Sequence, residues 1–525
     1  MKVLISDPLA AEGVAILRDA GLEVCEVAGL PPDELRSTLA DYDALIVRSG
    51  TKVTADVLQG AHRLKVIGRA GAGVDNIDTH AATHRGIVVM NTPGGNTVSA
   101  CELTMAMMLA LARRLPQAST RVKAGEWPRR EFMGTELQGK QLGIVGLGRI
   151  GSEVARRAVA FDMHVVAFDP FLTDERARRL EVRPTTFDLL LATSDVITIH
   201  SPRNADTLGL IDAAAFQKMK PGVLLINCAR GGIIDENALL KALQDGTVAG
   251  CALDVFQNEP PANSPLLALE QVIATPHVGA TTREAQTNVA TQIAHQIVEI
   301  LRGDPPRNAV NTPALDPELY AILGPYIDLA QRLGRLTVQL AGGRIEALTV
   351  TYRGPMNEHD VRPLTAAVLE GLLQRALSTP VNAINAPIIA EELGIQVDVL
   401  KSTELEDFAN LIAIDARTRD GDLSVAGTLF GRNAPRIVRI DNYHVDAAPT
   451  GHLLITRNQD QPGVIAHVST VLAQRGVNVA DMTCGRDRPG GTSTLVISID
   501  NPVPPDVVRQ IEASPLILKA QLVTL

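Results

Sequence analysis

Short apolar runs alternate with segments of helical periodicity over the first part of the chain. The apolar runs predict strands over 2–7, 22–27, 44–47 and 64–68, and the periodic segments predict helices over 12–20 and 33–39. This alternation is typical of a parallel sheet covered by helices. Ligands of such sheets lie beyond the carboxyl ends of the strands, so the polar residues after each strand are the candidates for function.

A second alternating set begins after a long apolar helix. That helix is predicted over 98–115 and is expected to end at Pro116, with Met105, Met107 and Met108 in the core. The second set of strands covers 141–145, 164–168, 196–200, 223–227, 251–255 and 272–274. A further helix over 281–301 ends at Gly303, and 308–311 then return the chain to the first sheet. The first domain is therefore expected to be discontinuous.

The last part of the chain has a different pattern. Residues 313–449 mix helices and strands, and Arg436, Arg439 and His444 within them could form an anion site or, more simply, the solvated face of a strand. From 452 the order is strand (452–456), helix (464–474), strand (477–483), strand (492–499), helix (504–513) and strand (519–524). This βαββαβ order predicts a ferredoxin-like domain.

One segment of the second set has the order of a dinucleotide-binding unit. A strand is followed by Gly146, Gly148 and Gly151 in the spacing G-x-G-x-x-G, then by a helix and a second strand that ends at Asp169. The first glycine permits a tight turn, the second lets the backbone approach a pyrophosphate, and the third lets helix and strand pack closely. The N–H groups at the helix start face the phosphates. Asp169 is placed to bind a ribose, and no basic residue follows before Arg176, which favours NAD over NADP.

Composition narrows the class of protein. The 525 residues have a net charge of −10 and are 46% hydrophobic, without an apolar run long enough to span a membrane. The acidic balance and the 3% aromatic content argue against a nucleic-acid surface. Five scattered cysteines form neither a disulfide framework nor a metal-binding pattern, so no metal is expected. The N-terminus has no signal-peptide layout, and the expected location is a reducing cytoplasm.

Charged residues after the strands of the first set provide candidate binding groups. Arg48, Lys52 and Arg69 follow two of these strands. The planar donor fork of arginine matches the oxygens of phosphate and carboxylate, so the three cations would suit a dianionic substrate. From position alone, three solvated surface cations are an equally good interpretation.

Arg230, Glu259 and His277, which follow strands of the second set, fit hydride transfer from a secondary alcohol. Such a reaction needs a base for the hydroxyl proton and a cation for the neighbouring carboxylate and the developing carbonyl oxygen. His277 suits the first role because histidine titrates near neutrality, and Glu259 could bond its far ring nitrogen. Arg230 could hold the carboxylate with two parallel bonds. Each residue alone could be structural, but together, behind a nucleotide fold, they indicate a dehydrogenase.

Three blocks resemble the signatures of the D-isomer-specific 2-hydroxyacid dehydrogenases, namely LLINCARGGIIDENALLKAL (224–243), DVFQNEP (254–260) and ATPHVGA (274–280). Blocks at 47–53, 68–78, 91–104 and 132–137 resemble the D-3-phosphoglycerate dehydrogenases within this family. The last segment, with Asp460-Gln-Pro-Gly463 and Gly476-Val-Asn478, resembles a regulatory ACT domain. The unit before it resembles the intervening domain of the long form of these enzymes.

The resemblance implies a reaction and a set of contacts. The reaction is the NAD-dependent oxidation of 3-phospho-D-glycerate to 3-phosphooxypyruvate, the first step of the phosphorylated route to L-serine, with His277 as proton donor and acceptor, Glu259 as its partner and Arg230 as carboxylate anchor. NAD contacts are implied for Gly146, Gly148, Arg149, Ile150, Gly151, Asp169, Ser201, Cys228, Ala229, Arg230, Asp254, His277, Gly279 and Ala280. Substrate contacts are implied for Arg48, Lys52, Arg69, Asn96 and Arg129, and contacts with L-serine as an effector for Asn458, Asp460 and Asn478. Two departures from the family pattern are Ala72, where relatives often have a hydroxyl residue, and Asn458, where an aromatic residue can occur.

The expected fold class is α/β, with two Rossmann-like parallel-sheet domains, a mixed α/β intervening domain and a ferredoxin-like βαββαβ ACT domain. The expected boundaries are 1–97 with 283–312 for the substrate-binding domain, 98–282 for the inserted NAD-binding domain, 313–449 for the intervening domain and 450–525 for the ACT domain. Such dehydrogenases look like dimers paired through their nucleotide domains, and ACT domains commonly pair as well. A homotetramer, or a homodimer, is therefore expected.

Two other functions stay open at this point. A dehydrogenase for another D-2-hydroxy acid, such as glycerate, lactate or glyoxylate, would share the signature blocks, although the cations and the regulatory domain favour a phosphorylated substrate. A non-catalytic, NAD-sensing module that binds partners could retain Arg230, Glu259 and His277. Turnover by the purified protein distinguishes this module from an enzyme.

Overall fold

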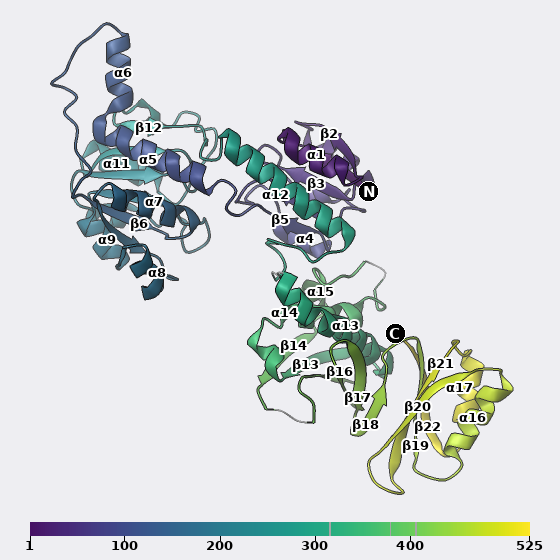
Figure 1. The fold of residues 1–525 in the computed structure, drawn as a ribbon. Helices are drawn as coiled ribbons and strands as arrows, with labels where there is room; N and C mark the ends of the chain where they lie inside the picture. Colours follow the sequence, from purple (N-terminus) through teal and green to yellow (C-terminus); the bar gives the residue numbers. More distant parts are fainter. Residues whose placement is uncertain (314, 316, 378–379, 405–406, 420) are drawn as a thin grey trace.

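Four β-sheets organise the chain (Figure 1). The computed structural model describes residues 1–525 apart from 314, 316, 378, 379, 405, 406 and 420. Sheets of five and seven strands are parallel, a sheet of six strands is mixed, and a sheet of four strands is antiparallel. The expected α/β class is confirmed. We refer to the units built on these sheets, in chain order, as the first, second, third and C-terminal domains.

The first domain has the strand order β2-β1-β3-β4-β5. Its elements are β1 (Lys2–Ile5), α1 (Ala11–Asp19), β2 (Glu23–Glu26), α2 (Pro32–Thr38), β3 (Ala44–Val47), α3 (Ala55–Leu58), β4 (Val66–Arg69), α4 (Thr79–His84), β5 (Val88–Met90) and, from later in the chain, α12 (Arg283–Arg302). α12 packs on α1 and β4. The approach is close because Gly13 has no side chain: a Cβ atom there would lie 2.7 Å from the Ala290 carbonyl oxygen. After α12 the chain returns to β5, where Val310 donates its N–H to the Val89 carbonyl.

The second domain has the doubly wound order β12-β11-β10-β9-β6-β7-β8. Its strands are β6 (Gln141–Val145), β7 (His164–Phe168), β8 (Arg183–Pro184), β9 (Val196–Ile199), β10 (Val223–Asn227), β11 (Val248–Leu253) and β12 (Val272–Ala274). Its helices are α5 (Thr97–Arg113), α6 (Leu115–Lys123), α7 (Arg149–Ala160), α8 (Asp174–Arg179), α9 (Phe187–Thr193), α10 (Ala213–Lys218) and α11 (Glu236–Gln244). α5 and α7 bury apolar residues on one face of the sheet, and α9, α10 and α11 cover the other. Met105, Met107 and Met108 are in the core, as expected.

The helix predicted to end at Pro116 ends earlier, so this prediction was wrong. α5 stops at Arg113, Arg114 adopts a left-handed conformation with φ 50°, and α6 begins at Leu115. Pro116 therefore lies in the first turn of α6, where its missing N–H costs no helical hydrogen bond. α6 buries none of its residues and projects from the second domain (Figure 1).

The third domain has the sheet order β14-β13-β15-β16-β17-β18. Its elements are α13 (Pro317–Leu340), β13 (Ile345–Arg353), α14 (Arg362–Leu373), α15 (Ala386–Glu392), β14 (Gln396–Ser402), β15 (Leu411–Thr418), β16 (Gly421–Phe430), β17 (Ala434–Ile440) and β18 (Tyr443–Ala447). α13 and α14 pack on each other and bury apolar residues against the sheet. α15 contacts α4 of the first domain, where His84 Nε2 lies 3.2 Å from the Glu392 carboxylate.

The C-terminal domain has the sheet order β20-β21-β19-β22, which is the predicted ferredoxin-like arrangement. Its elements are β19 (His452–Gln459), α16 (Val464–Gln474), β20 (Val479–Arg486), β21 (Thr492–Ile499), α17 (Pro505–Glu512) and β22 (Ile517–Thr524). α16 and α17 cover one face of this sheet. The other face joins the core of the third domain, because Leu453, Ile455, Val496 and Val523 belong to the same apolar cluster as residues of α13 and β13.

Two sequence expectations concern surfaces. Arg436, considered for an anion site, forms an ion pair with Asp446 at 3.6 Å, while Arg439 and His444 pair across β17 and β18. The acid beside Arg436 argues against an anion site there. Among the described residues, no helix has both the length and the apolar character needed to cross a membrane.

Candidate active site

The glycine loop after β6 lies at the switch point of the second sheet, beside the end of β9. Gly146 has φ 91°, which L side chains rarely adopt, and a Cβ atom at Gly151 would collide with the Gly146 carbonyl oxygen. A Cβ atom at Gly148 would meet nothing within 4 Å. α7 begins at Arg149, so the unpaired N–H groups of its first turn adjoin this open space. The loop therefore fits the pyrophosphate of a dinucleotide.

Asp169, at the end of β7, is tied to the same loop. Its carboxylate accepts hydrogen bonds from the N–H groups of Leu147 and Phe171, each at 2.8 Å, and keeps lone pairs for ribose hydroxyls. Arg176 on α8 reaches back to this loop, and its Nη2 donates to the Leu147 carbonyl at 2.7 Å and to the Ser152 hydroxyl at 3.0 Å. The sequence analysis treated Arg176 only as remote from Asp169. The sequence could have indicated this contact, because Arg176 lies on the helix that directly follows β7.

His277 and Glu259 form a hydrogen bond of 2.8 Å between Nδ1 and Oε2. The two side chains are 44% and 39% exposed, in loops after β12 and β11. The other Glu259 oxygen accepts the N–H of Phe256 at 3.1 Å, which fixes the carboxylate. Because Nδ1 is engaged, Nε2 is the ring nitrogen available for proton exchange. A cavity of about 400 Å³, lined by both residues, lies beside the pair.

Asp254 fixes the loop that carries His277. It is 1% exposed, and its carboxylate accepts the Thr275 hydroxyl at 2.7 Å and the N–H groups of Val278 and Gly279 at 2.8 Å each. These bonds hold His277 at φ 52°, a left-handed conformation that costs a non-glycine residue about 1–3 kcal/mol. Asp254 therefore positions His277. Any contact between Asp254 and a cofactor would use the lone pairs of the carboxylate that these three bonds leave free.

Arg48 and Arg230 lie close enough to Arg69 to affect its pKa. Arg48 follows β3, Arg69 ends β4 and Arg230 follows β10 of the second domain. Burial, and then the nearby charges of Arg230 and Arg48, lower the pKa of Arg69 to about 10. Within the described chain, the Nε atoms of Arg48 and Arg69 are buried without a hydrogen-bond partner. Such donors favour an anionic acceptor in the space that they face.

Arg230 is held from the first domain by Asp75, which the sequence analysis missed. Arg230 Nε donates to Asp75 Oδ2 at 2.9 Å, and Nη1 donates to the Ala229 carbonyl at 2.7 Å. A Cβ atom at Gly73 would collide with Arg230 Nη2, so glycine leaves room for the guanidinium in its present position against this loop. The available signal was an acid in the loop after β4, the strand that ends in Arg69.

Two further residues that the sequence analysis missed shape the loop after β3. Asp7 Oδ2 accepts the N–H groups of Arg48 at 2.6 Å and of Thr51 at 3.1 Å. The Asn76 side chain donates to the Arg48 carbonyl at 2.8 Å. Asp7 follows β1, so this support lies at the β1/β3 switch point of the first sheet.

The other predicted substrate residues differ in position. Lys52 is exposed next to the loop of Arg48, and the half-buried Asn96 directly precedes α5. Arg129 is exposed in the segment between α6 and β6. This segment extends away from the first domain (Figure 1).

The remaining predicted cofactor residues line the strand ends of the second sheet. Ser201 follows β9 and donates its hydroxyl to the Val145 carbonyl at 3.2 Å, next to Gly146. Cys228 and Ala229 are buried after β10, and burial raises the pKa of the Cys228 thiol to about 12. Gly279 is buried, while Ile150 and Ala280 are half-buried. No group of three or more His, Cys, Asp or Glu side chains among the described residues could hold a metal ion.

The three predicted effector residues have different environments. Asn458 is 2% exposed, and its amide is engaged by Thr456 at 3.0 Å and Ser493 at 2.6 Å under the helices of the C-terminal domain. Asp460 accepts the N–H of Gly490 at 3.0 Å, and the exposed Asn478 donates to Asp500. Asn478 is accessible, and Asp460 is half-buried with Arg486 Nη1 at 3.5 Å from its Oδ2, whereas a ligand of Asn458 would have to displace Ser493.

Comparison with known proteins places this site in a class. Family profiles match residues 105–279 as D-isomer specific 2-hydroxyacid dehydrogenase, NAD binding domain, 322–441 as D-3-phosphoglycerate dehydrogenase intervening domain, and 452–515 as ACT domain. The D-lactate dehydrogenase of Aquifex aeolicus, solved with NAD and lactic acid, is 29% identical, with a TM-score of 0.53 over 60% of this chain and 100% of that one. The TT0316 protein of Thermus thermophilus is 36% identical, with a TM-score of 0.56 over 59% and 100%. Fold and site define an NAD-binding dehydrogenase of the D-isomer-specific 2-hydroxyacid class.

Full-length relatives narrow this class. The D-3-phosphoglycerate dehydrogenase of Archaeoglobus fulgidus is 45% identical over 100% of both chains, and that of Methanocaldococcus jannaschii is 42% identical over 100% of both. The Bacillus subtilis enzyme of the same name is 41% identical over 100% of this chain and 99% of its own. The chain belongs to the D-3-phosphoglycerate dehydrogenase family.

Proposed function

We propose that this chain oxidises 3-phospho-D-glycerate to 3-phosphooxypyruvate with NAD, the first step of the phosphorylated route to L-serine. The observation that carries the proposal is the pair of buried, unpartnered Nε donors on Arg48 and Arg69, near the guanidinium of Arg230. A substrate with a phosphate at one end and a carboxylate at the other supplies acceptors for all three arginines. The family relationship and the dinucleotide loop support the same reaction.

His277 is the proposed base. Its Nδ1 is bonded to Glu259, so Nε2 takes the proton of the 2-hydroxyl group as the carbonyl bond forms. The Glu259 carboxylate stabilises the imidazolium that results. NAD, when bound, supplies the nicotinamide ring that accepts the hydride. In the reverse direction His277 returns the proton to the carbonyl oxygen.

We propose the following binding roles. Arg230 is proposed to hold the α-carboxylate, and Arg48, Lys52 and Arg69 the phosphate, with Asn96 near the carboxylate end. Arg129 is proposed to contribute only if a second copy of the chain brings its exposed segment to the site. Cofactor contacts are proposed for the residues of the glycine loop and strand ends, namely Gly146, Gly148, Arg149, Ile150, Gly151, Asp169, Ser201, Cys228, Ala229, Asp254, Gly279 and Ala280.

Steady-state kinetics with Arg48→Ala and Arg69→Ala test the substrate. Each variant loses charge-assisted hydrogen bonds, so we expect the KM for phosphoglycerate to rise by about tenfold to a hundredfold with little change in the KM for NAD. Arg18→Ala is the control, because Arg18 forms an exposed ion pair with Glu26 on another face of the first domain. An unchanged KM contradicts the phosphate assignment. Faster turnover of D-glycerate, D-lactate or glyoxylate than of the phosphorylated substrates in either direction identifies another 2-hydroxy acid dehydrogenase.

We also propose that L-serine binds the C-terminal domain, through Asp460 and Asn478, and slows turnover in a homodimer or homotetramer. The support is the match to the ACT domain, the exposure of Asn478 and the partial exposure of Asp460. Rates of the full-length chain with and without L-serine test this, with Asp460→Asn as the variant and Asp506→Asn, in an exposed pair with Arg475, as the control. Inhibition that Asp460→Asn leaves unchanged excludes this site, and light scattering measures the oligomer.

A further inference from the structure

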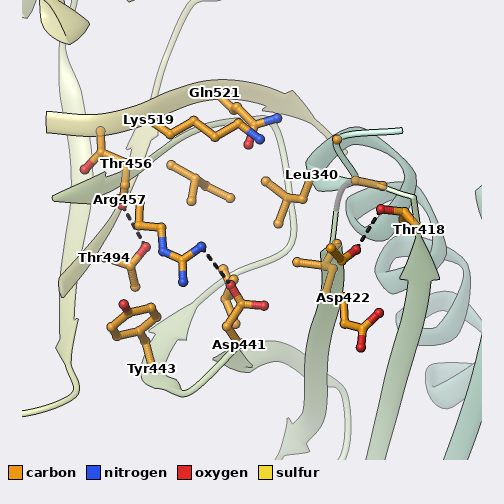
Figure 2. Close-up of a pocket in the computed structure, with 16 residues that line it drawn as sticks. Leu340, Thr418, Asp422, Asp441, Tyr443, Thr456, Arg457, Thr494, Lys519 and Gln521 are labelled. Carbon is orange, nitrogen blue, oxygen red and sulfur yellow. Dashed lines mark hydrogen bonds and ion pairs between the residues drawn. The ribbon is translucent and has the colours of Figure 1, made fainter. Parts of the chain in front are cut away.

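A cavity of about 220 Å³ lies between the sheets of the third and C-terminal domains (Figure 2). β19, β21 and β22 line it on one side, and the end of α13 with strands of the third domain lines it on the other. It is at the opposite end of the molecule from the glycine loop of the second domain (Figure 1). None of the proposed active-site or serine-binding residues lines it.

The charges that line this cavity are separated by domain. Arg457 on β19 and Lys519 on β22 belong to the C-terminal domain, whereas Asp422 on β16 and Asp441, between β17 and β18, belong to the third domain. Figure 2 shows the Arg457 side chain extending across the cavity from its strand toward Asp441. One wall is therefore cationic and the opposite wall anionic.

These charges are poorly satisfied by one another. Arg457 Nη1 lies 3.9 Å from Asp441 Oδ2, well beyond the distance of about 2.7–2.9 Å of a charge-assisted hydrogen bond. Arg457 also lies 6.0 Å from the centre of the Tyr443 ring. Lys519 and Asp422 are exposed to solvent, and the structure gives their charged groups no hydrogen bond to another described residue. The Asp441 carboxylate is kept in place by the N–H of Ser424 at 3.2 Å.

We propose that this cavity binds a short-chain α-amino acid as a zwitterion, with its carboxylate on Arg457 and Lys519 and its ammonium group on Asp441 and Asp422. A simple anion would face two carboxylates, and a simple cation would face two basic groups. A molecule with both charges a few bonds apart matches both walls. The volume is below the range of about 300–1,000 Å³ of sites for larger ligands, which favours a ligand of a few heavy atoms.

The site is separate from the proposed serine site. Side chains alternate between the two faces of a strand, so Asn458 shares a face with Leu454, which packs against the helices, while Arg457 faces the third domain. A ligand here contacts both domains at once and strengthens their contact. The proposal does not depend on the dehydrogenase reaction, and its failure leaves the proposed function untouched.

Isothermal titration calorimetry of the full-length chain tests the proposal, with L-alanine and L-serine as zwitterions and with ethylamine and propionate as probes that lack one charge. We expect L-alanine to bind at one site per chain that ethylamine and propionate do not fill, and L-serine to fill this site in addition to the proposed serine site. Arg457→Gln, Asp441→Asn and Lys519→Gln should each weaken this binding at least about tenfold, as loss of a charged hydrogen bond does. Arg436→Gln, which breaks the ion pair with Asp446 outside the cavity, is the matched control and should bind normally.

Several results would overturn the proposal. Absence of amino-acid binding up to about 10 mM, where even a weak site with a dissociation constant near 1 mM is filled, does so directly. Equal binding of ethylamine or propionate removes the zwitterion argument. Binding that survives in the exposed Lys519→Gln variant and in Asp441→Asn, but is lost in Asp460→Asn, places the amino acid at the proposed serine site instead. Thermal melting of each variant separates a lost ligand contact from a misfolded chain.

Discussion

The guanidinium of Arg230, in the second domain, donates a hydrogen bond of 2.9 Å to the carboxylate of Asp75, in the first domain. The two residues are 155 positions apart in the chain, and their contact joins the two parallel-sheet domains at the proposed substrate site. Arg230 is 30% exposed and Asp75 57%, so water screens the pair and a substrate carboxylate can compete for the guanidinium. Asp75 therefore orients Arg230 without occupying it permanently.

Removing Asp75 should lower kcat/KM for phosphoglycerate more than it changes the KM for NAD. We expect Asp75→Ala to lower kcat/KM for phosphoglycerate by about tenfold, because Arg230 loses its orientation, and Asp75→Asn, which keeps an acceptor oxygen, to lower it less. The KM for NAD should stay within about twofold in both variants. Asp33→Ala, in an exposed ion pair with Arg36, is the control. Wild-type kinetics in Asp75→Ala would show that Arg230 needs no support from the first domain.

Loss of the proposed base should affect kcat far more than binding. His277→Asn removes the proton acceptor, and we expect kcat to fall by about 10²–10⁴-fold. Glu259→Gln keeps a group that can accept the bond from Nδ1 but removes the negative charge, so its kcat should fall less than that of His277→Asn. NADH formation at 340 nm measures the rates, and NAD titration followed by fluorescence checks that the cofactor still binds. A larger effect of Glu259→Gln than of His277→Asn would reverse the assigned roles.

Asp169 should set the preference between the two nicotinamide cofactors. A carboxylate at this position accepts hydrogen bonds from ribose hydroxyls and repels a 2′-phosphate. Arg176 is a cation near the same loop, since its Nη2 donates to the Leu147 carbonyl at 2.7 Å. We therefore expect Asp169→Ser to reduce the ratio of kcat/KM for NAD to that for NADP by at least about tenfold. The double variant with Arg176→Ala should recover part of this ratio, because the nearby cation is gone. A ratio unchanged in Asp169→Ser would locate the discrimination elsewhere.

His200 should make the second domain less stable in acid. Burial lowers its pKa from 6.5 to about 4, and its Nε2 lies 3.0 Å from the Thr198 hydroxyl. Between these values the unfolded chain binds a proton that the folded chain does not, so the free energy of unfolding falls as the pH falls from about 6.5 toward 4, by roughly 3 kcal/mol in total. His200→Asn should remove this part of the pH dependence, and His164→Asn, at an exposed position of the same sheet, should not. Melting curves across this pH range decide the matter, and equal slopes in wild type and His200→Asn would contradict it.

The parts of the site that lie within one short segment were predictable from the sequence. The glycine loop, Asp169, and the bond between His277 and Glu259 depend on local spacing and on which strands end at one sheet edge. The contact between Asp75 and Arg230 was not predictable in this way, because it depends on how two separate domains face each other. The role of Arg129 stays a prediction, because its position relative to a second copy of the chain cannot be read from local spacing.

One missed feature could have been read from strand alternation. Leu454, Thr456 and Asn458 share a face of β19, and Leu454 is buried under the helices, so Asn458 was bound to be buried with it. Arg457, between them, had to face the other way, toward the third domain. The opposing charges of the interdomain cavity remained hidden, because the sequence does not state which sheet covers that face.

Leu453, Ile455, Val496 and Val523 form one apolar cluster with residues of the third domain, so the last two domains share one core. A chain cut between them near Pro449 would leave a long apolar strip on each piece, and fragments of this kind tend to aggregate. For protein engineering, the exchangeable cassette begins before α13 and runs to the C-terminus. A chimaera that contains the C-terminal domain therefore also needs the third domain, whose apolar residues pack against its sheet.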